Sequence, residues 1–317
     1  MVKRVCWTLL AVAAAASGFA AAQTFPSKTV HLVSGVTPGS ASDTMARILA
    51  EKLTASLGQQ VIVENWLGAG GLVGASRVAK TDPDGHTIMV YASAFTVSPL
   101  LTPGVLDPKD LTPVATIATI PTVLVVKADK GYKTVADLVA AAKAKPGAIV
   151  ATSAGVGSAT HMNLERFRIA AGIEVLHVPL KGAPEALTEV LTGRADFYFA
   201  LPFQARAQAG KVLALAVGSP KRSSLFPDVP TTVEAGYPNS DYNFWVGALI
   251  ASKTPREIVQ RLHREFNAAV NAPDVRERIV KTGADPLTLT LPEFEAMIRE
   301  EFEANAKLIK AANIKAN

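Results

Sequence analysis

Cysteine is nearly absent from this sequence: the 317 residues contain one, Cys6. Cys6 lies in a segment with the features of a secretory leader, in which two basic residues precede the apolar run 5–16 and the small-residue end Ala20-Ala21-Ala22. A basic start, a short apolar stretch and an Ala-x-Ala end predict cleavage near Ala22, before Gln23, and export to the periplasm. The mature chain would then contain no cysteine, which excludes disulfides, thiol catalysis and cysteine-ligated metals.

Charged residues are also few. They make up 19% of the chain, against 49% hydrophobic residues, and this balance indicates a globular protein with a large core. The net charge of +5 falls to +3 with the leader, because Lys3 and Arg4 leave and no acidic residue goes with them. No basic cluster remains, so nucleic acid is not an expected partner. A membrane anchor is the alternative to a cleaved leader, but the run 5–16 is shorter than the ~20 residues that a span needs.

Motifs for metals and nucleotides are missing. The five histidines form no H-x-H or H-E-x-x-H pair, so no metal site is expected. No Gly-Lys-Ser/Thr follows a glycine-rich loop, which excludes a P-loop. The glycine-rich stretch 68–74 follows a strand pattern, but Val73 stands where a dinucleotide fingerprint needs glycine. The sequence therefore predicts no cofactor.

Short apolar runs alternate with helical patterns along the rest of the chain. This alternation predicts an α/β protein whose mostly parallel sheets are flanked by helices on both faces, and the length allows two domains. The runs 122–127 and 243–251 are candidates to cross between two lobes, with Phe244 and Trp245 packing at the hinge. Lobe 1 would then comprise residues 23–123 plus 246–317, and lobe 2 residues 124–245. The expected strands are 30–36, 60–64, 87–92, 114–118, 122–127, 148–152, 174–179, 195–199, 213–217 and 244–251, and the clearest helices are 135–144, 160–171, 184–191 and 293–312.

The loop 37–43 is the first candidate site, and it reads Thr37-Pro38-Gly39-Ser40-Ala41-Ser42-Asp43. It joins a strand pattern to a helical pattern, so small and hydroxylated residues surround free backbone N–H groups at the positive end of a helix. That arrangement suits a carboxylate or a phosphate. A second loop of the same kind, 153–158, follows a strand pattern in the other lobe. Two such loops facing each other across a cleft would clamp an anion.

Ser153 also supports a different interpretation. The stretch 151–155, Ala-Thr-Ser-Ala-Gly, resembles the nucleophile elbow of a serine hydrolase, with alanine in place of the first glycine. Asp196 and His263 follow Ser153 in the order that a catalytic triad would need. Two glycines keep the loop open for several residues, however, whereas an elbow begins its helix directly after the serine. A binding loop is favoured, and an exported serine hydrolase using Ser153 is the alternative.

Three further residues have two interpretations each. His161, in the first turn after the second loop, is either a packing residue or a ligand contact. Asp43 either caps free helix N–H groups or contacts the ligand. Lys181, at the mouth of a loop after the strand pattern 174–179, is either solvated or supplies the positive charge that an anion needs.

Several motifs occur in a characteristic order. They are Pro38-Gly39-Ser40-Ala41-Ser42-Asp43 with Ala46-Arg47, Val63-Glu64-Asn65, Gly68-Ala69-Gly70-Gly71-Leu72-Val73-Gly74, Asp82-Pro83-Asp84-Gly85, Gly155-Val156-Gly157-Ser158 with His161, His177-Val178-Pro179-Leu180-Lys181-Gly182, and Asp228-Val229-Pro230-Thr231 with Glu234. With this set the chain resembles, over essentially its whole length, the Bug receptors, which are the periplasmic solute-binding proteins of tripartite tricarboxylate transporters. Each motif alone is weak, but the ordered set is specific.

The resemblance implies a two-lobed Venus-flytrap protein that encloses a small carboxylate and catalyses no reaction. The ligand would be a mono- or dicarboxylic acid, with an aromatic or amide tail as an option, and the partners would be the ligand and, transiently, the membrane subunits of the transporter. The receptor is expected to be a monomer, and a receptor that serves a sensor is an alternative. In the family, loops equivalent to 37–43 and 153–158 hold the carboxylate. The expected ligand-binding residues are Thr37, Pro38, Gly39, Ser40, Ala41, Asp43, Ser93, Ser153, Gly157, Ser158, His161, Lys181 and Asp196.

The chain departs from the family at Gly35-Val36-Thr37, where members commonly show a Phe-x-Pro lead, and at two further positions that bear on the pocket. Ser40 stands where members commonly have glycine, and Leu180 where tyrosine is frequent. Each change alters the shape and the hydroxyl content of the expected site.

Overall fold

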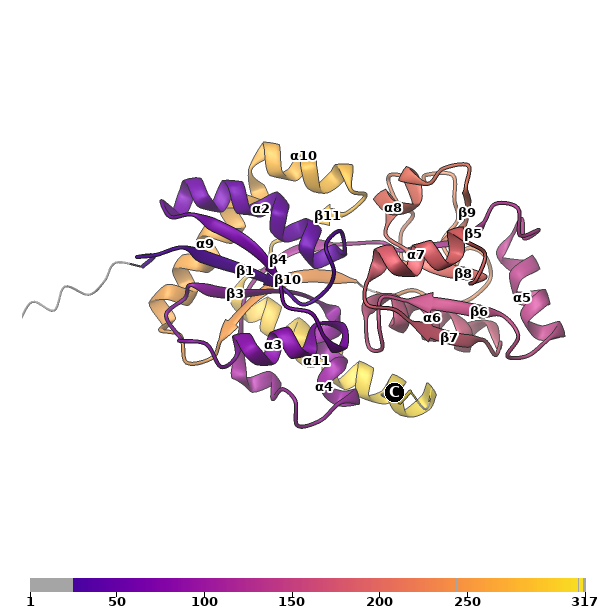
Figure 1. Ribbon diagram of the computed structural model, residues 1–317, viewed down its shortest axis with the longest axis horizontal. Helices are drawn as coiled ribbons and strands as arrows, with labels where there is room; N and C mark the ends of the chain where they lie inside the picture. The colour runs from indigo at the N-terminus through magenta and orange to yellow at the C-terminus, as the bar shows by residue number, and fades with distance from the viewer. Residues whose placement is uncertain (1–24, 243, 313, 316–317) are drawn as a thin grey trace, which may run out of the picture.

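The computed structural model describes residues 25–242, 244–312 and 314–315, so the predicted leader lies outside the described residues. Two sheets lie side by side, each with helices on both faces (Figure 1). The six-stranded sheet has the order β11-β4-β10-β3-β1-β2, and the five-stranded sheet has the order β7-β6-β8-β5-β9. We call the first sheet with its helices lobe 1 and the second sheet with its helices lobe 2. The two-lobed α/β fold expected from the sequence is confirmed.

Lobe 1 has helices packed on both faces of its sheet. In β1, Leu32 packs in the cluster that contains α2 and α9, and the next residue, Val33, packs in the cluster that contains α3 and α11. This alternation follows from the two-residue period of a strand. The strands are β1 (Val30–Ser34), β2 (Val61–Asn65), β3 (Thr87–Ala92), β4 (Leu111–Thr119), β10 (Trp245–Ala251) and β11 (Asp285–Pro286). The helices are α2 (Ala41–Leu57), α3 (Leu72–Val78), α4 (Ser98–Leu101), α9 (Arg256–Asn271), α10 (Pro273–Lys281) and α11 (Leu291–Ala312).

Lobe 2 repeats this layered plan. Phe167 of α6 meets Phe197 and Phe199 of β8 edge to face, with ring centroids 6.2 and 5.8 Å apart, while Tyr198 points to the opposite face of the sheet. The strands are β5 (Val123–Lys127), β6 (Val150–Ser153), β7 (Leu176–Pro179), β8 (Phe197–Ala200) and β9 (Val212–Val217). The helices are α5 (Val135–Ala144), α6 (Ala159–Ala171), α7 (Ala183–Leu191) and α8 (Pro202–Ala207).

Each sheet is mixed rather than mostly parallel. β1 pairs in parallel with β2 and β3, and β6 pairs in parallel with β7 and β8. By contrast, β10 is antiparallel to β3 and β4, and β5 is antiparallel to β8 and β9. β5 and β10 are the strands that enter a sheet from the other lobe, without the crossover helix that a parallel strand requires, and β11 is antiparallel to β4 within lobe 1. The residue boundaries expected for the lobes, 123/124 and 245/246, remain predictions.

Trp245 packs at the second crossing, as the sequence predicts. It is fully buried, and its indole N–H donates to Oε2 of Glu301 in α11 at 2.7 Å. The Thr96 hydroxyl donates to the same oxygen at 3.2 Å. Burial raises the pKa of Glu301 to about 7, and these two hydrogen bonds oppose the rise only in part.

Candidate functional site

Three helices begin at one place between the lobes. α2 of lobe 1 begins after its N-cap residue Ser40, and in lobe 2 α6 begins after Ser158 and α7 after Gly182. The first amides of a helix have no carbonyl partner inside it, and the helix dipole adds positive potential there. These helix starts share a small cavity of about 40 Å³, which is lined by Val36, Ser40, Ala41, Ser42, Gly70, Tyr91, Ala92, Ala94, Ala154, Ser158, Ala159, Thr160, Ala183, Leu201 and Phe244.

The cavity wall supplies hydroxyls and amides. In α2 the N-cap and second helical residues are Ser40 and Ser42. In α6 the same two positions are Ser158 and Thr160. Alanine at the first helical position of each leaves the nearby amides uncovered. No side chain lining the cavity is charged among the residues that the structure describes, so a bound anion would be neutralised by helix ends and hydroxyls.

Two aromatic residues complete the wall. Phe244 precedes β10, and Tyr91 lies near the end of β3, so Phe244 has a place in the cavity besides its expected packing at the hinge. The Tyr91 hydroxyl is buried near the Ser98 hydroxyl, and no close hydrogen bond to it is recorded among the described residues. Burial raises the pKa of this phenol, and a buried hydroxyl without a close partner costs about 1–3 kcal/mol. Because Tyr91 lines the cavity, its phenol is a candidate partner for a polar group of a ligand.

Asp43 anchors the loop in front of α2. Its side chain is buried, and Oδ2 accepts the Gly39 amide at 2.8 Å and Nε of Arg47 at 3.0 Å. Oδ1 accepts Nη2 of Arg47 and Nδ2 of Asn65, both at 2.9 Å. Burial acts to raise the pKa of Asp43, but the hydrogen bonds from Arg47, Gly39 and Asn65 outweigh it and lower the pKa. Of the two interpretations of Asp43, the geometry favours the anchoring role.

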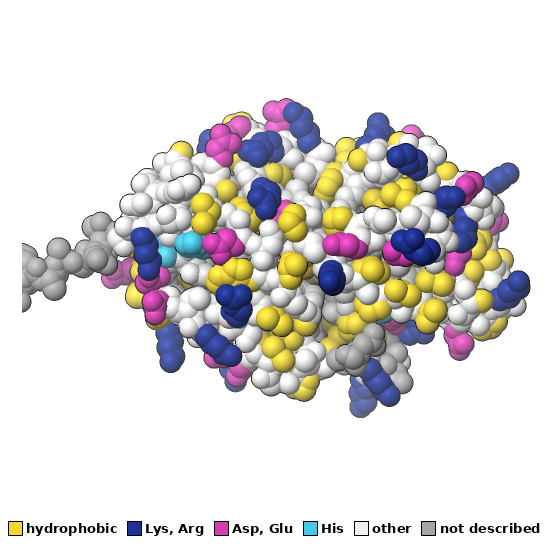
Figure 2. Space-filling model, in the orientation of Figure 1, with side chains coloured by type: hydrophobic (Ala, Val, Ile, Leu, Met, Phe, Trp, Pro, Cys, Tyr) yellow, Lys and Arg dark blue, Asp and Glu magenta, His cyan; other side chains and the backbone are white. Residues whose placement is uncertain are grey.

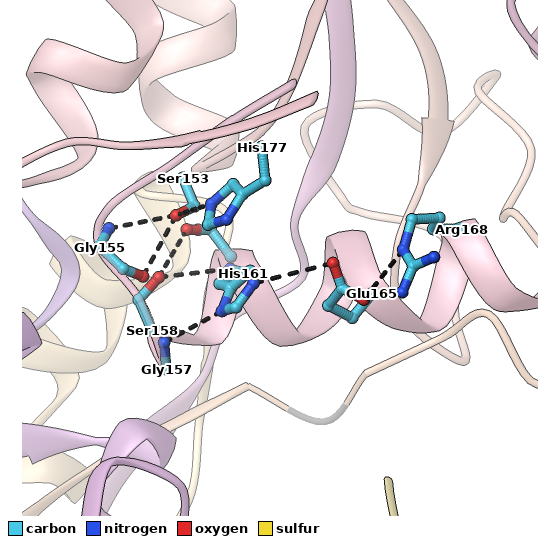
Figure 3. Close-up of polar contacts among 9 residues, drawn as sticks. Ser153, Gly155, Gly157, Ser158, His161, Glu165, Arg168 and His177 are labelled. Carbon is cyan, nitrogen blue, oxygen red and sulfur yellow. Dashed lines mark hydrogen bonds and ion pairs between the residues drawn. The ribbon is translucent and has the colours of Figure 1, made fainter. Parts of the chain in front are cut away.

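Two histidines stack behind the second loop (Figure 3). The rings of His161 and His177 lie 4.1 Å apart at an angle of 7°. The Gly157 amide donates to Nδ1 of His161 at 3.0 Å, which leaves the ring proton on Nε2, 3.8 Å from Oε1 of Glu165. Burial, followed by His177 and Arg168, lowers the pKa of His161 to about 3, and burial lowers the pKa of His177 to about 4. Both rings are therefore neutral near pH 7, and His161 holds the loop amide of Gly157.

Ser153 is held inside lobe 2. Its Oγ lies 2.7 Å from Nε2 of His177, donates to the Gly155 carbonyl at 3.1 Å and accepts the Gly155 amide at 3.2 Å. The direction of the Ser153–His177 hydrogen bond follows the tautomer of His177, because the serine has one proton for two acceptors. Ser153 is fully buried and does not line the cavity. Its contacts fix the shape of the loop.

The structure does not assemble the triad that the hydrolase alternative requires. His263 belongs to α9 in lobe 1, where Nδ1 bonds the Val114 carbonyl at 2.7 Å. Asp196 lies at the start of β8, where it accepts the Val150 amide at 2.8 Å and pairs with Lys130 at 3.0 Å. Neither residue is recorded in a contact with Ser153. The hydrolase alternative was built on the order of the three residues along the chain, and that order does not bring them together in the fold.

The predicted residues fall into two groups. Ser40, Ala41 and Ser158 line the cavity. The others do not line it. In lobe 1, Thr37 bonds Glu185 across the lobes, Pro38 is exposed, Gly39 and Asp43 bond each other, and Ser93 is buried. In lobe 2, Gly157 bonds His161, Ser153 is buried, Asp196 pairs with Lys130, and Lys181 lines an adjoining groove.

The adjoining groove is larger than the cavity and lies between the same two lobes. Its volume is about 500 Å³, and Gly70 lines both spaces. Leu180 and Lys181 stand on the lobe 2 side, and 67–69 on the lobe 1 side. Lys181 can therefore meet a ligand that extends beyond the cavity, whereas it does not face the helix starts.

Sequence reasoning missed much of the cavity wall. Ser42 and Thr160 could have been found, because each is the second residue of a helix whose first turn faces the site. Tyr91 and Phe244 carry no such signal, because strand pairing brings them together. The alanines that line the cavity also gave no signal in the sequence, because they contribute to the cavity only through their small size.

One face of the molecule shows a mixture of charges. On the face drawn in Figure 2, basic and acidic side chains are interspersed, and the two lobes meet without an open channel. This face lacks the basic stripe of nucleic-acid-binding proteins. Within the described ranges, no helix is both long enough and apolar enough to span a membrane.

Comparison with known proteins places the chain among solute receptors. Residues 45–314 match the family described as "Tripartite tricarboxylate transporter family receptor". A curated relative, the "UPF0065 protein in tcbD-tcbE intergenic region" of Pseudomonas sp. (strain P51), is 36% identical over 298 residues, which cover 92% of this chain and 89% of the relative.

Solved structures agree with this family. The periplasmic binding protein BugD superposes with a TM-score of 0.87 at 28% identity, covering 92% of this chain and 100% of its own. Rpa4515 of R. palustris, solved with adipate, has a TM-score of 0.88 at 28% identity, with coverage of 92% and 100%. MatC of Rhodopseudomonas palustris, solved with bound malate, has a TM-score of 0.84 at 28% identity, with coverage of 90% and 100%.

Proposed function

The chain belongs to the receptor family of tripartite tricarboxylate transporters, and from this membership we propose that it captures a small carboxylate between its lobes and delivers it to a membrane transporter of that type. The observation that carries the proposal is the meeting of three helix starts at one uncharged cavity. The protein acts outside the cytoplasm, in the periplasm, after the leader is cleaved near Ala22. It binds as a monomer and catalyses no reaction.

The ligand's carboxylate lies at the starts of α2 and α6, where the first amides and four hydroxyls converge. The rest of the ligand faces Val36, Tyr91, Leu201, Phe244 and the alanines, so its body is small and largely apolar. The dicarboxylates named with two similar structures, adipate and malate, support the ligand class. In this chain a second carboxylate would reach beyond the cavity toward Lys181 in the adjoining groove.

Carboxylates should raise the melting temperature of the protein, and their amides should not. A ligand at 100 times its dissociation constant stabilises the folded state by about 2.7 kcal/mol. The test is a thermal-shift screen of matched pairs such as benzoate with benzamide, malate with malamide and adipate with adipamide. The amide keeps the body of each ligand and removes the charge that the helix starts neutralise. Equal shifts within the pairs, or shifts with sugars alone, would refute the proposal.

Replacing Tyr91 with phenylalanine should weaken binding of a ligand that bonds the phenol by about 5- to 30-fold, because one hydrogen bond inside the site is lost. The ligand-free protein should keep its melting temperature or gain a few degrees, since the buried hydroxyl has no partner there. Isothermal titration and thermal melting measure the two effects.

Tyr198→Phe is the matched control. The hydroxyl of Tyr198 is also buried without a partner among the described residues, yet it does not line the cavity. This variant should leave affinity unchanged. Equal affinity losses in both variants would remove Tyr91 from the site.

A further inference from the structure

The helix α7 begins without a capping side chain of its own. Its N-cap residue is Gly182, which has no side chain, and its third helical residue is Glu185. A capping box normally pairs a Ser or Thr hydroxyl at the N-cap with a Glu or Gln at the third position. In α7 the acidic half of this motif is present and the hydroxyl half is missing.

Lobe 1 supplies the missing hydroxyls. Ser40 Oγ accepts the amide of Ala183, the first residue of α7, at 3.2 Å. The Thr37 hydroxyl donates to Oε2 of Glu185 at 3.1 Å. Figure 1 shows the start of α2 facing α7 across the boundary between the lobes. The cap of α7 is thus completed by residues of the opposite lobe.

Ser40 serves α7 instead of its own helix. It occupies the N-cap position of α2 with extended backbone, but its hydroxyl makes no capping bond to α2 in the described structure. Its oxygen accepts the amide of Ala183, and its proton faces only a long contact of 3.5 Å with the Thr37 hydroxyl, so a group in the cavity, which Ser40 also lines, can take that proton. One hydroxyl therefore touches both α7 and the space for the ligand.

Gly182 is a glycine because the lobes approach closely there. Its φ of −175° is extended backbone that any residue adopts. A Cβ at this position would overlap Oγ1 of Thr37 and lie 3.0 Å from Oγ of Ser40. Within α7 itself the close atom is Oε2 of Glu185 at 3.1 Å, at the end of a flexible side chain, so the overlap with lobe 1 is the main reason for this glycine.

We propose that Thr37 and Ser40 of lobe 1, with the segment 182–185 of lobe 2, form a closure latch. The cap of α7 is complete when the lobes are closed and is lost when they open, so the latch favours the closed form. A bound carboxylate accepts the Ser40 proton and couples closure to occupancy of the cavity. The coupling rests on the proposed function, and the latch itself does not.

Interlobe distance tests the latch directly. The expected mature chain, residues 23–317, contains no cysteine, so Asp82→Cys in lobe 1 and Lys143→Cys in lobe 2 give two exposed sites for a donor and an acceptor dye. Single-molecule energy transfer then reports the ratio of closed to open molecules. Ser40→Ala should lower this ratio, and any carboxylate affinity, by about 3- to 10-fold. Gly182→Ala should shift the population further toward the open form.

Thr188→Ala is the control. Thr188 is exposed on α7 and bonds the Pro184 carbonyl within its own helix, so its loss should leave the ratio unchanged. If Gly182→Ala fails to fold, the closed-to-open ratio of Ser40→Ala still tests the latch. The latch is overturned if Ser40→Ala closes and binds like the parent, or if Thr188→Ala opens the lobes equally.

The two proposals fail in different ways. If the parent binds no carboxylate but Ser40→Ala still opens the ligand-free lobes, the latch stands and the proposed ligand class falls. If the parent binds and closes around a carboxylate and both latch variants do the same, the ligand class stands and the latch falls.

Discussion

Between pH 7 and pH 5, the protein should lose about 4 kcal/mol more stability than its His161→Gln/His177→Gln variant. The folded pKa values of about 3 and 4 lie below the ordinary value of 6.5. Unfolded chains therefore take up two protons in a pH range where the folded protein binds none at these sites. This contribution to stability is full above pH 6.5 and is lost as the pH falls toward 4 and then 3.

The comparison with the variant is needed because Glu301 titrates in the opposite sense. Burial raises its pKa to about 7, so its contribution is present at low pH and is lost as the pH rises through 7. Urea unfolding at several pH values measures both proteins. If their stability curves run parallel between pH 7 and 5, the histidine pair does not control acid stability.

Thr134→Ala separates titration from simple destabilisation. Thr134 caps α5 in the same lobe and accepts the Asp137 amide at 3.2 Å. Loss of this cap should cost about 1 kcal/mol at every pH. The plot of its unfolding free energy against pH should therefore be offset from that of the parent without a change in slope.

Replacing Asp43 with alanine should lower the free energy of unfolding by about 2–4 kcal/mol, because four donors lose a buried charged acceptor. The donors are the Gly39 amide, two nitrogens of Arg47 and the Asn65 amide. The melting temperature should fall by roughly 5–10 °C in a protein of this size. Carboxylate affinity should fall as well, since the loop in front of α2 loses its anchor.

Asp274→Ala is the control for this change. Asp274 is also an acid in the first turn of a lobe 1 helix and pairs with Lys52 at 3.1 Å, but that pair is exposed. Exposed ion pairs contribute little, so its melting temperature should match that of the parent. An Asp43→Ala protein as stable as Asp274→Ala would show that the buried network does not hold the loop.

Local signals explain the elements that the sequence predicted well. The helix α5 has the predicted bounds, 135–144, because Thr134 and Asp137 form a capping box at its start and Pro146-Gly147 follows its end. β4 was harder: the pattern predicts a strand from Val114, whereas the strand begins at Leu111 and includes Pro113. Proline is tolerated there because the pairing with β10 is irregular, with a register shift beside the Leu249–Pro113 pair. That irregularity is a tertiary property.

The candidate site also combines features that local sequence signals predict with features that depend on tertiary contacts. The loops 37–43 and 153–158 were predictable, because small residues between a strand pattern and a helical pattern form a local signal. The partner of Ser153 was not, because β6 and β7 must pair in parallel, with Ala151 beside His177, before the serine meets that ring. The contact of Ser40 with α7 was equally hidden, since it needs both lobes in place.

The position of β10 also sets the order in which the sheets of the two lobes can form. β10 lies between β3 and β4 in its sheet, yet all of lobe 2 separates it from β4 in the sequence. Lobe 2 draws its five strands from one continuous stretch, so it can form its sheet as soon as β9 is available. The sheet of lobe 1 stays divided until the chain has passed residue 251, and closing that long loop carries an entropic cost. A chain that is exported N-terminus first would therefore complete the sheet of lobe 2, in the middle of the sequence, before the sheet of lobe 1, which contains the N-terminal strands.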